Sequence, residues 1–349
     1  MRIAEVAPLY ESVPPKYYGG TERVVSYLTE ELVRQGHEVT LFASGDSETT
    51  ARLMAACQRS LRLDKRYQGQ MAPHFVMLER VFQHAQEFDI IHFHVDYLHF
   101  PLSRRKAVTH VTTLHGRLDI PDLIPLYQEF REMPVISISD SQREPLPWAN
   151  WQATVYHGLP RDIYRFHPEP GSYLAFLGRI SPEKRVDRAI EIAKRVGMPL
   201  KIAAKVDQVD KDYFDSVISP LLHDSPVEFV GEIGDVEKDE FLGNAYALLF
   251  PIDWPEPFGL VMIEAMACGT PVVAYRDGAV PELVEPDQTG FIVESLEDAV
   301  EAVRRVAELS RKRCREVFEK RFTATRMAHD YVRQFERLIA RNEEVSEAA

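Results

Sequence analysis

Hydrophobic positions along the chain alternate between short apolar runs and longer stretches with helical spacing. Residues 2–8, RIAEVAP, and residues 37–44, HEVTLFAS, have the composition of buried strands. Between them, residues 19–36 repeat apolar side chains at helical intervals, with Thr21 as the expected N-cap and Gly36 as the expected end. Strands that alternate with helices in this way predict parallel sheets flanked by helices.

The same alternation continues to the end of the chain. Further strands are predicted at 88–96, 111–116, 135–140, 173–179, 199–205, 227–231, 248–251 and 270–275. Helices are predicted at 181–197, at 239–247, from about Leu260, and over 322–341, where the pattern is that of a long amphipathic helix. Several of the strands end in polar residues, and strand ends are where open α/β sheets bind ligands.

The length of 349 residues fits two domains. A stretch rich in proline and glycine, residues 158–171, has no clear period and is the expected linker. We therefore expect an N-terminal α/β domain over 1–160, a C-terminal α/β domain over 161–325, and a last helix over 326–349 that crosses back to the first domain. The first strand–helix junction lacks G-x-G-x-x-G, which weakens a dinucleotide-binding interpretation.

Charge and cysteine content narrow the class of protein. A formal net charge of −13 argues against nucleic acid as a partner, because proteins that bind nucleic acids present a basic surface. Three cysteines, Cys57, Cys268 and Cys314, have no motif spacing, which favours a reducing compartment. The sequence shows no signal peptide and no apolar run of membrane-spanning length, so a cytoplasmic protein is predicted.

Two cations flank the predicted start of the helix after the strand at 173–179. Ser181 is the expected N-cap and Pro182 the first helical residue, which places Lys184 in the first turn. A cation there opposes the helix dipole at a cost of roughly 0.3–1 kcal/mol. With Arg179 just before the turn, the pair is better explained by a bound diphosphate than by solvated surface charges.

Residues 254–274, WPEPFGLVMIEAMACGTPVVA, contain two glutamates in an apolar stretch. No near N-cap precedes the helix from about Leu260, so its N–H groups are available to a phosphate or a sugar oxygen. Glu264 lies more than one turn inside that helix, where a buried carboxylate requires hydrogen-bond donors. A ribose diol offers two donors; a structural arginine is the alternative partner. Glu256, on the preceding loop, is placed to bind sugar hydroxyls.

Residues 178–185, GRISPEKR, followed by 256–274 resemble the nucleotide-sugar glycosyltransferases of family 4, whose pattern has Arg and Lys after a strand and then two glutamates separated by seven residues. The resemblance covers most of the chain, including 19–39, 113–116, 227–233 and 289–293. The sequence also resembles an antibiotic-oligosaccharide branch of this family.

The resemblance implies a GT-B fold of two Rossmann-like domains facing across a cleft, retention at the anomeric carbon, and no obligatory metal or cofactor. It implies that Arg179 and Lys184 bind the donor diphosphate and that Glu264 holds the ribose. Glu256, with the backbone of Phe258 and Gly259, would hold the donor sugar. The other residues implied in donor binding or catalysis are Gly19 and Gly20 at the first loop, His115 at the transferred sugar, Glu232 and Ile233 at the base, and Leu260 at the helix start.

The substrates implied are a nucleotide-sugar donor and a saccharide or small-molecule acceptor. Family frequency alone puts UDP first and GDP second as the donor nucleotide. Many relatives read Asn-Gly before the linker where this chain has His157, so His157 is assigned no catalytic role. Relatives with lipid acceptors bind membranes through basic patches, but the basic clusters at 59–67 and 102–108 are short and favour a solvated surface.

Three other classes of protein are alternatives. His92, His94 and Asp96 alternate along a predicted strand and would face one side, as in the metal sites of some barrel hydrolases. The second half of the chain fits a barrel poorly, so a polar strand end is the favoured interpretation. A sugar-binding protein without turnover is the other alternative, and a same-fold epimerase or phosphorylase is a third.

Overall fold

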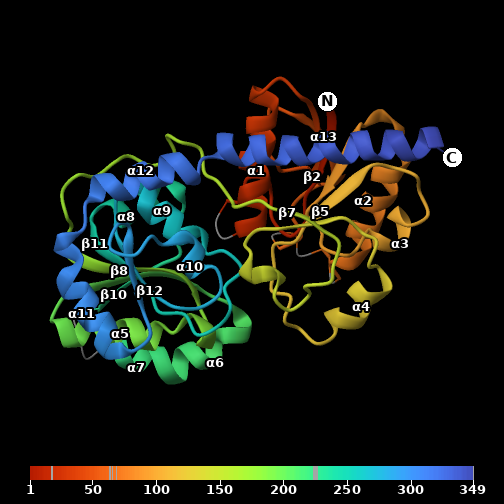
Figure 1. Cartoon of the computed structure of the whole chain (residues 1–349). Coiled ribbons are helices and arrows are strands. Elements are labelled where there is room, and N and C mark those ends of the chain that lie inside the picture. The colour runs from red at the N-terminus through yellow and green to blue at the C-terminus, as the bar shows by residue number, and fades with distance from the viewer. Residues whose placement is uncertain (17–18, 63, 65, 68, 223–226, 349) are drawn as a thin grey trace. The chain divides into compact units, whose positions relative to one another are not determined.

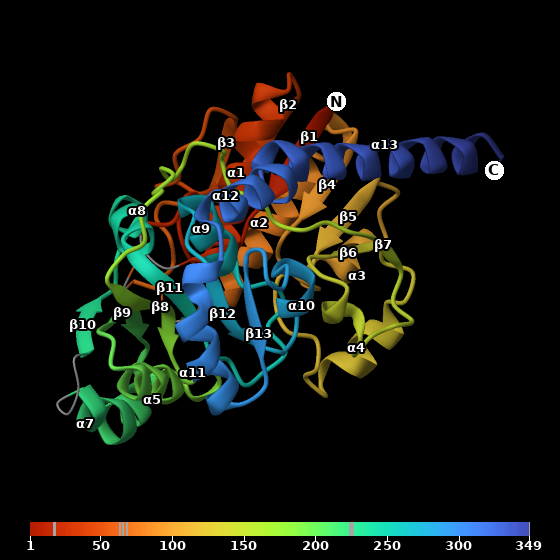
Figure 2. The same ribbon diagram turned by 60° about the vertical axis from the view of Figure 1, so that its left-hand side comes forward.

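The computed structural model describes residues 1–16, 19–62, 64, 66–67, 69–222 and 227–348. The chain divides into two compact units, which are shown in Figures 1 and 2. Unit 1 comprises Met1–Gly158 and Ala324–Ala349, and unit 2 comprises Leu159–Thr323. The proline-rich stretch 159–171 is thus part of unit 2. It is held there by a hydrogen bond from the His167 amide to the Cys268 carbonyl at 2.9 Å.

Among the described residues, unit 1 has a seven-stranded sheet in the order β3-β2-β1-β4-β5-β6-β7, with every pair of neighbours parallel. Its strands are β1 (Arg2–Val6), β2 (Glu38–Ser44), β3 (Arg52–Cys57), β4 (Ile90–Phe93), β5 (His110–Thr113), β6 (Val135–Ser137) and β7 (Trp151–Thr154). The chain runs outward from β1 to β3 and then restarts at β4 on the other side of β1. The switch point of this sheet therefore lies between β1 and β4.

Helices cover both faces of the unit 1 sheet. They are α1 (Gly20–Arg34), α2 (Met71–Gln83), α3 (Phe100–Ser103), α4 (Leu123–Glu129) and α13 (Ala324–Ala348), with 3-10 turns η1 (Ala85–Glu87) and η2 (Ser141–Arg143). Alternate residues of β1 and β4 form one core with α2. On the opposite face, α1 and α13 lie side by side, and the buried Tyr331 and Phe335 of α13 pack on His92.

Among the described residues of unit 2, six parallel strands are ordered β10-β9-β8-β11-β12-β13. They are β8 (Tyr173–Ile180), β9 (Leu200–Val206), β10 (Val227–Gly231), β11 (Ala245–Phe250), β12 (Val272–Tyr275) and β13 (Gly290–Val293). Here the chain runs outward from β8 and restarts at β11 beside it. Both sheets thus have the same doubly wound connectivity, and the switch point of unit 2 lies between β8 and β11.

Helices also enclose the unit 2 sheet on two faces. The longer ones are α5 (Val186–Val196), α8 (Asp235–Gly243), α9 (Leu260–Cys268), α11 (Leu296–Arg305) and α12 (Arg311–Arg321). The shorter ones are α6 (Lys211–Tyr213), α7 (Ser219–Leu222) and α10 (Val280–Leu283), with η3 (Pro182–Lys184), η4 (Gln208–Asp210), the π-helix η5 (Phe214–Ile218) and η6 (Val306–Glu308). Helices α5 and α11 cover one face, and α8, α9 and α12 cover the other (Figure 1).

Two predicted helix starts are wrong. Helix α1 begins at Gly20 with Gly19 as N-cap, so Thr21 is the second helical residue. Ser181 leads into the 3-10 turn η3, and Arg185 then adopts a left-handed conformation with φ 53° before α5 begins at Val186. Lys184 is therefore not in the first turn of α5, and the predicted opposition to a helix dipole does not apply to it.

The helix predicted over 239–247 is displaced in the structure. Helix α8 covers Asp235–Gly243, and Ala245 already belongs to strand β11. The start is earlier because Gly234 is the N-cap and donates its N–H to the Glu237 side chain at 3.0 Å. The strand begins at Ala245 because this apolar stretch is buried against β8 and β12.

No helix in the part of the chain that the structure describes is both long enough and apolar enough to cross a membrane. Cys57, Cys268 and Cys314 are unpaired and buried.

Candidate active site

The loops that follow β8 and β11 meet at the switch point of the unit 2 sheet. Arg179 lies near the carboxyl end of β8 and Lys184 in the turn after it, while Glu256 follows β11. Because β8 and β11 are parallel neighbours, their carboxyl ends open at the same edge of the sheet. This edge is where open α/β sheets bind ligands, and the structure brings Lys184 and Glu256 together there.

Lys184 and Glu256 form a direct ion pair between the two loops. The ammonium group also lies 4.8 Å from the ring centroid of Trp254 and 5.8 Å from that of Phe250. The Lys184 side chain is 16% exposed and that of Glu256 is 12% exposed. The aromatic rings and the carboxylate hold the ammonium group in a defined position, and the side chain keeps some exposure to solvent.

Arg179, near the carboxyl end of β8, is held by acidic partners. Its Nη2 donates to Glu183 Oε1 at 2.6 Å, and its Nε lies 3.7 Å from Asp210 Oδ2. Burial alone would raise the pKa of Glu183. Hydrogen bonding from its backbone, and then from Arg179, outweighs burial and lowers that pKa, so Glu183 is ionised and positions the guanidinium group.

The loop that carries Glu256 is fixed by a neighbouring backbone segment. The Ala279 amide donates to the Glu256 carbonyl at 2.9 Å. Gly278 has φ 50°, and a Cβ at this position would lie 2.3 Å from the Glu256 backbone N and O atoms. Only glycine permits this approach, so the position of Glu256 depends on the loop after β12 as well as its own.

Glu264 is buried in α9, being 2% exposed. Its partner is a lysine and not an arginine: Lys238 Nζ of α8 lies 2.7 Å from Glu264 Oε1. The Tyr164 hydroxyl is 3.5 Å from the same oxygen. Lys238 was missed at the sequence level because it stands in an acidic run of an exposed-looking helix, and only the packing of α8 on α9 reveals its partner.

The start of α9 lies beside these groups. Gly259 is its N-cap, with φ 87° and no side-chain cap, and Leu260 is the first helical residue. The side chain of Phe258 is buried and packs edge-on against Phe322 with ring centroids 6.4 Å apart, which leaves its backbone for any role at the surface. Glu232 and Ile233 lie in the loop between β10 and α8, at the same edge of the sheet, and Glu232 is exposed.

The remaining predicted residues lie in unit 1. Gly19 precedes α1, and a Cβ there would lie 2.8 Å from Pro15 Cβ; Gly20 is the first residue of α1. His115 follows β5, and its Nε2 is 2.8 Å from His94 Nδ1. The ring of His157, to which no role was assigned, stacks on His115 with centroids 5.3 Å apart and 15° between the planes.

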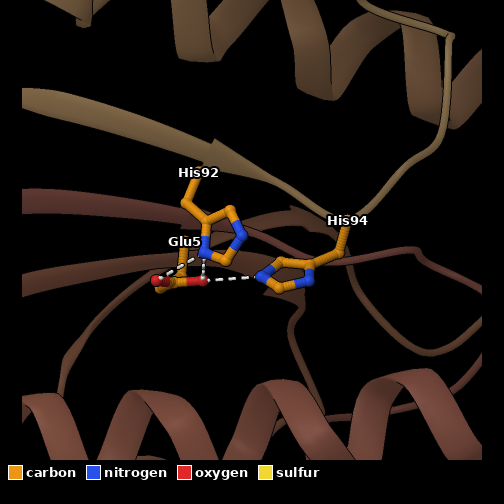
Figure 3. A group of neighbouring side chains, drawn as sticks. All are labelled: Glu5, His92 and His94. Atoms are coloured by element: carbon orange, nitrogen blue, oxygen red, sulfur yellow. Dashed lines mark hydrogen bonds and ion pairs between the residues drawn. The ribbon is translucent and has the colours of Figure 1, made fainter. Parts of the chain in front are cut away.

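The histidine cluster of unit 1 differs from the predicted one. Strand β4 ends at Phe93, and Asp96 has φ 49° and is exposed, so Asp96 does not join His92 and His94 on one strand face. The two histidines instead share the buried carboxylate of Glu5 from the neighbouring strand β1 (Figure 3). Strand pairing, which places Glu5 opposite His92, brings this third residue in.

Comparisons with known proteins identify the family of the chain. The sequence profile of the group 1 glycosyl transferases matches residues 165–321, and that of glycosyltransferase family 4 matches residues 18–176. The chain is 26% identical over 226 residues to an uncharacterized glycosyltransferase of Methanocaldococcus jannaschii, MJ1178; the alignment covers 60% of this chain and 62% of that protein.

Solved structures resemble the whole chain. AviGT4, a glycosyltransferase involved in avilamycin A biosynthesis, superimposes with a TM-score of 0.74 at 23% identity, covering 97% of this chain and 98% of that one. HepE from Anabaena, solved in complex with UDP-glucose, gives a TM-score of 0.72 at 19% identity over 96% and 99% of the two chains. At these identities the likeness establishes the fold.

Two parallel α/β sheets of this connectivity form the GT-B fold, which the chain shares with these solved structures. The chain belongs to family 4 of the retaining glycosyltransferases, enzymes of EC class 2.4. The predicted fold class and family are thereby confirmed.

Proposed function

We propose that this protein transfers a hexosyl group from a nucleotide-sugar donor, UDP-linked in preference to GDP-linked, to a saccharide or small-molecule acceptor with retention of anomeric configuration. The observation that carries the proposal is the ion pair of Lys184 and Glu256 at the unit 2 switch point, with Arg179 near the carboxyl end of β8. These groups lie on adjacent strand ends, where a ligand with a diphosphate and a sugar can reach both a cation and an anion.

The cations act on the leaving group. When the glycosidic bond to the diphosphate breaks, negative charge develops on its oxygen, and positive charges already in place stabilise that charge without reorganisation. Lys184, fixed by Trp254 and Glu256, is preorganised in this sense. Because two protein cations serve this role, the proposed reaction needs no obligatory metal ion or other cofactor.

Glu256 and Glu264 bind the neutral parts of the donor. A carboxylate has about four lone-pair positions, so Glu264 can accept from the ribose diol while Lys238 stays bound at Oε1. Glu256, with the backbone of Phe258 and Gly259, binds hydroxyls of the sugar. The uncapped N-terminus of α9, from Leu260, offers N–H groups to a phosphate oxygen.

The other predicted residues complete the proposal. The base lies at Glu232 and Ile233, at the carboxyl end of β10. Gly19 and Gly20 allow the first loop of unit 1 to approach the donor, and His115 contacts the transferred sugar. UDP is favoured because HepE, a protein of the same fold, was solved with UDP-glucose. The acceptor is left open as a saccharide or small molecule.

The test is a donor-hydrolysis and transfer assay with UDP- and GDP-sugars in the presence of EDTA. Product configuration is read by the anomeric proton coupling in NMR spectra. The proposal expects turnover of one donor class that survives EDTA, with the donor's anomeric configuration kept. Binding of a nucleotide sugar with no turnover on any acceptor or water would favour the non-catalytic alternative, and inversion would contradict the proposal.

A metal-dependent hydrolase of His92, His94 and Asp96 is not supported, because Asp96 does not join the two histidines.

A further inference from the structure

The second switch point, in unit 1, contains a buried chain of hydrogen bonds that ends at His115. Glu5 Oε2 lies 2.7 Å from His94 Nε2, and His94 Nδ1 lies 2.8 Å from His115 Nε2. Glu5 and His94 are 0% and 2% exposed. In Figure 3, dashed lines join the Glu5 carboxylate to the imidazoles of both His92 and His94. The donor site described above uses none of these three residues.

The direction of each hydrogen bond follows from chemistry. Burial raises the pKa of Glu5, but the charge and hydrogen bond of His92 and then those of His94 outweigh it and hold this pKa at about 2. Burial first, and His92 second, lower the pKa of His94 to about 4, so this ring is neutral near pH 7. An ionised carboxylate only accepts. His94 therefore carries its proton on Nε2, donates it to Glu5, and presents a bare Nδ1.

The bare Nδ1 of His94 in turn fixes the proton of His115. Burial, and then His94 and His157, hold the pKa of His115 well below its ordinary value, so its ring is neutral as well. Its Nε2 faces an acceptor at 2.8 Å and must carry the proton. The Nδ1 atom of His115 is then a bare acceptor, and it is buried without a hydrogen-bond partner among the residues that the structure describes. Such an atom loses about 1–3 kcal/mol of solvation unless a ligand donates to it.

We infer that Glu5 and His94 are positioning residues that hold His115 as the Nε2–H tautomer, so that its Nδ1 accepts a hydrogen bond from a hydroxyl of the transferred sugar. The inference rests on the proposed function for its ligand, whereas the tautomer follows from the geometry of unit 1 alone. The stacked ring of His157, nearly parallel to that of His115, restricts rotation of the imidazole. His157 thus positions His115 by stacking on its ring.

A metal site of Glu5, His92 and His94 is the rival interpretation, because these residues could together offer three ligand atoms. Their facing atoms, however, are already paired at hydrogen-bond distances of 2.7–3.1 Å. Both remaining ring nitrogens are paired as well, His92 Nε2 to Thr113 Oγ1 at 2.7 Å and His94 Nδ1 to His115. All ring nitrogens and carboxylate oxygens of the cluster have hydrogen-bond partners. The chain of hydrogen bonds from Glu5 through His94 to His115 (the relay) is therefore the better explanation.

The first test measures the tautomer in the wild-type protein. Long-range ¹H–¹⁵N spectra of the full chain labelled with ¹⁵N-histidine, near pH 7, report the tautomer of each ring, and the signals of His115 are assigned by their loss in His115→Asn. The inference predicts a protonated Nε2 and an unprotonated Nδ1 for His115. The opposite tautomer, or rapid averaging of the two, would overturn it. One equivalent of tightly bound divalent metal in the purified protein, lost in Glu5→Gln, would overturn it in favour of the metal site.

The second test uses Glu5→Gln, whose amide keeps the size of the side chain but can donate to His94 Nε2. Such a donation moves the proton of His94 from Nε2 to Nδ1. His94 then donates to Nε2 of His115, whose own proton moves to Nδ1. We expect the reversed tautomer in the spectrum and a fall in kcat/KM of roughly tenfold, with UDP affinity unchanged. Tyr331→Phe is the matched control: its hydroxyl is 3.0 Å from Thr113 Oγ1 in the same cluster but does not lie between Glu5 and His115. It should change neither the tautomer nor kcat/KM.

A double-mutant cycle separates positioning from general damage. His115→Asn retains an acceptor near the Nδ1 position but loses the link to His94, so Glu5→Gln should cost nothing further in that background. An equal loss of kcat/KM in both backgrounds would mean that Glu5 acts through structure alone. If the wild-type protein binds no nucleotide and transfers no sugar, the proposed function fails while the tautomer measurement still decides the relay.

Discussion

The two switch points of this molecule have the same connectivity but use their charges in opposite ways. In unit 2, Lys184 and Glu256 lie on loops beyond the strand ends and stay 16% and 12% exposed. In unit 1, Glu5 and His92 lie within the strands and are fully buried. Charges on loops can reach a ligand directly, whereas charges inside the sheet can act only through a neighbour such as His115. Position relative to the strand end therefore separates binding groups from positioning groups.

The comparison predicts that the unit 1 cluster makes the protein acid-sensitive. The pKa of His94 is lowered to about 4 and that of His157 to about 3, both chiefly by burial, against about 6.5 in an unfolded chain. At a pH between the folded and unfolded pKa values of each ring, the unfolded state binds more protons than the folded state. The free energy of unfolding therefore falls as pH falls. From pH 6.5 to 4 we expect a loss of about 3 kcal/mol for each ring.

Urea unfolding followed at pH 7, 6, 5 and 4 measures this loss. Below pH 4.5, Glu5 adds to it, because a carboxyl whose folded pKa is near 2 loses its contribution as pH falls through that value. A stability that stays constant between pH 7 and 4.5 would contradict the burial of neutral histidines.

The next effect concerns the loop cations of unit 2. Lys184→Ala should lower kcat by about 10²–10³, the usual loss when one group that stabilises transition-state charge is removed. The fold should be unaffected, because the variant loses only a partly exposed ion pair. Thermal unfolding of the variant checks this. Lys201→Ala is the matched control because Lys201 also pairs with a carboxylate, Glu228 at 3.0 Å, and lies 4.8 Å from a ring, Tyr173, but near the amino end of β9. Equal losses of kcat in both variants would remove the assigned role of Lys184.

A smaller effect is expected for the ribose contact. Glu264→Gln should weaken UDP binding about tenfold, because the amide accepts less strongly from the diol. The weakening should largely vanish for 2′-deoxy-UDP, which lacks one donor. Glu285→Gln serves as the control, since this glutamate of the same unit pairs with Arg313 and Arg321 away from the switch point. Calorimetric titrations with both nucleotides measure these affinities. An equal loss of affinity for UDP and 2′-deoxy-UDP would contradict the ribose contact of Glu264.

The smallest effect is expected at Tyr331, which contacts the unit 1 cluster through Thr113. Tyr331→Phe removes one hydroxyl hydrogen bond to Thr113 in a buried place and should cost about 1 kcal/mol of stability. Activity should not change. A loss of activity larger than twofold would show that the hydrogen bonds through Thr113 and His92 also control His115. Tyr331 would then count as a positioning residue and not as a structural one.

The sequence predicted the sheets better than it predicted the contacts within the site. Apolar runs located most of the strands, because burial of both faces leaves a plain signal. The start of α5 was wrong because Arg185 takes a left-handed conformation that no local pattern indicates. Lys238 and Glu5 were missed for a different reason: their roles arise from helix packing and strand pairing between residues far apart in the chain. Glu264, by contrast, was found because a carboxylate in an apolar helix is itself unusual.

The central claim is that the unit 2 switch point binds a nucleoside diphosphate through Lys184 and its neighbours without a metal. The most direct measurement is calorimetric titration of the wild-type protein and Lys184→Ala with UDP, GDP, ADP and dTDP in EDTA. The account predicts that the wild-type protein binds one of these nucleotides, with UDP first, and that the variant binds it at least tenfold more weakly. Absence of binding by all four nucleotides, or equal affinity of the two proteins, would contradict it.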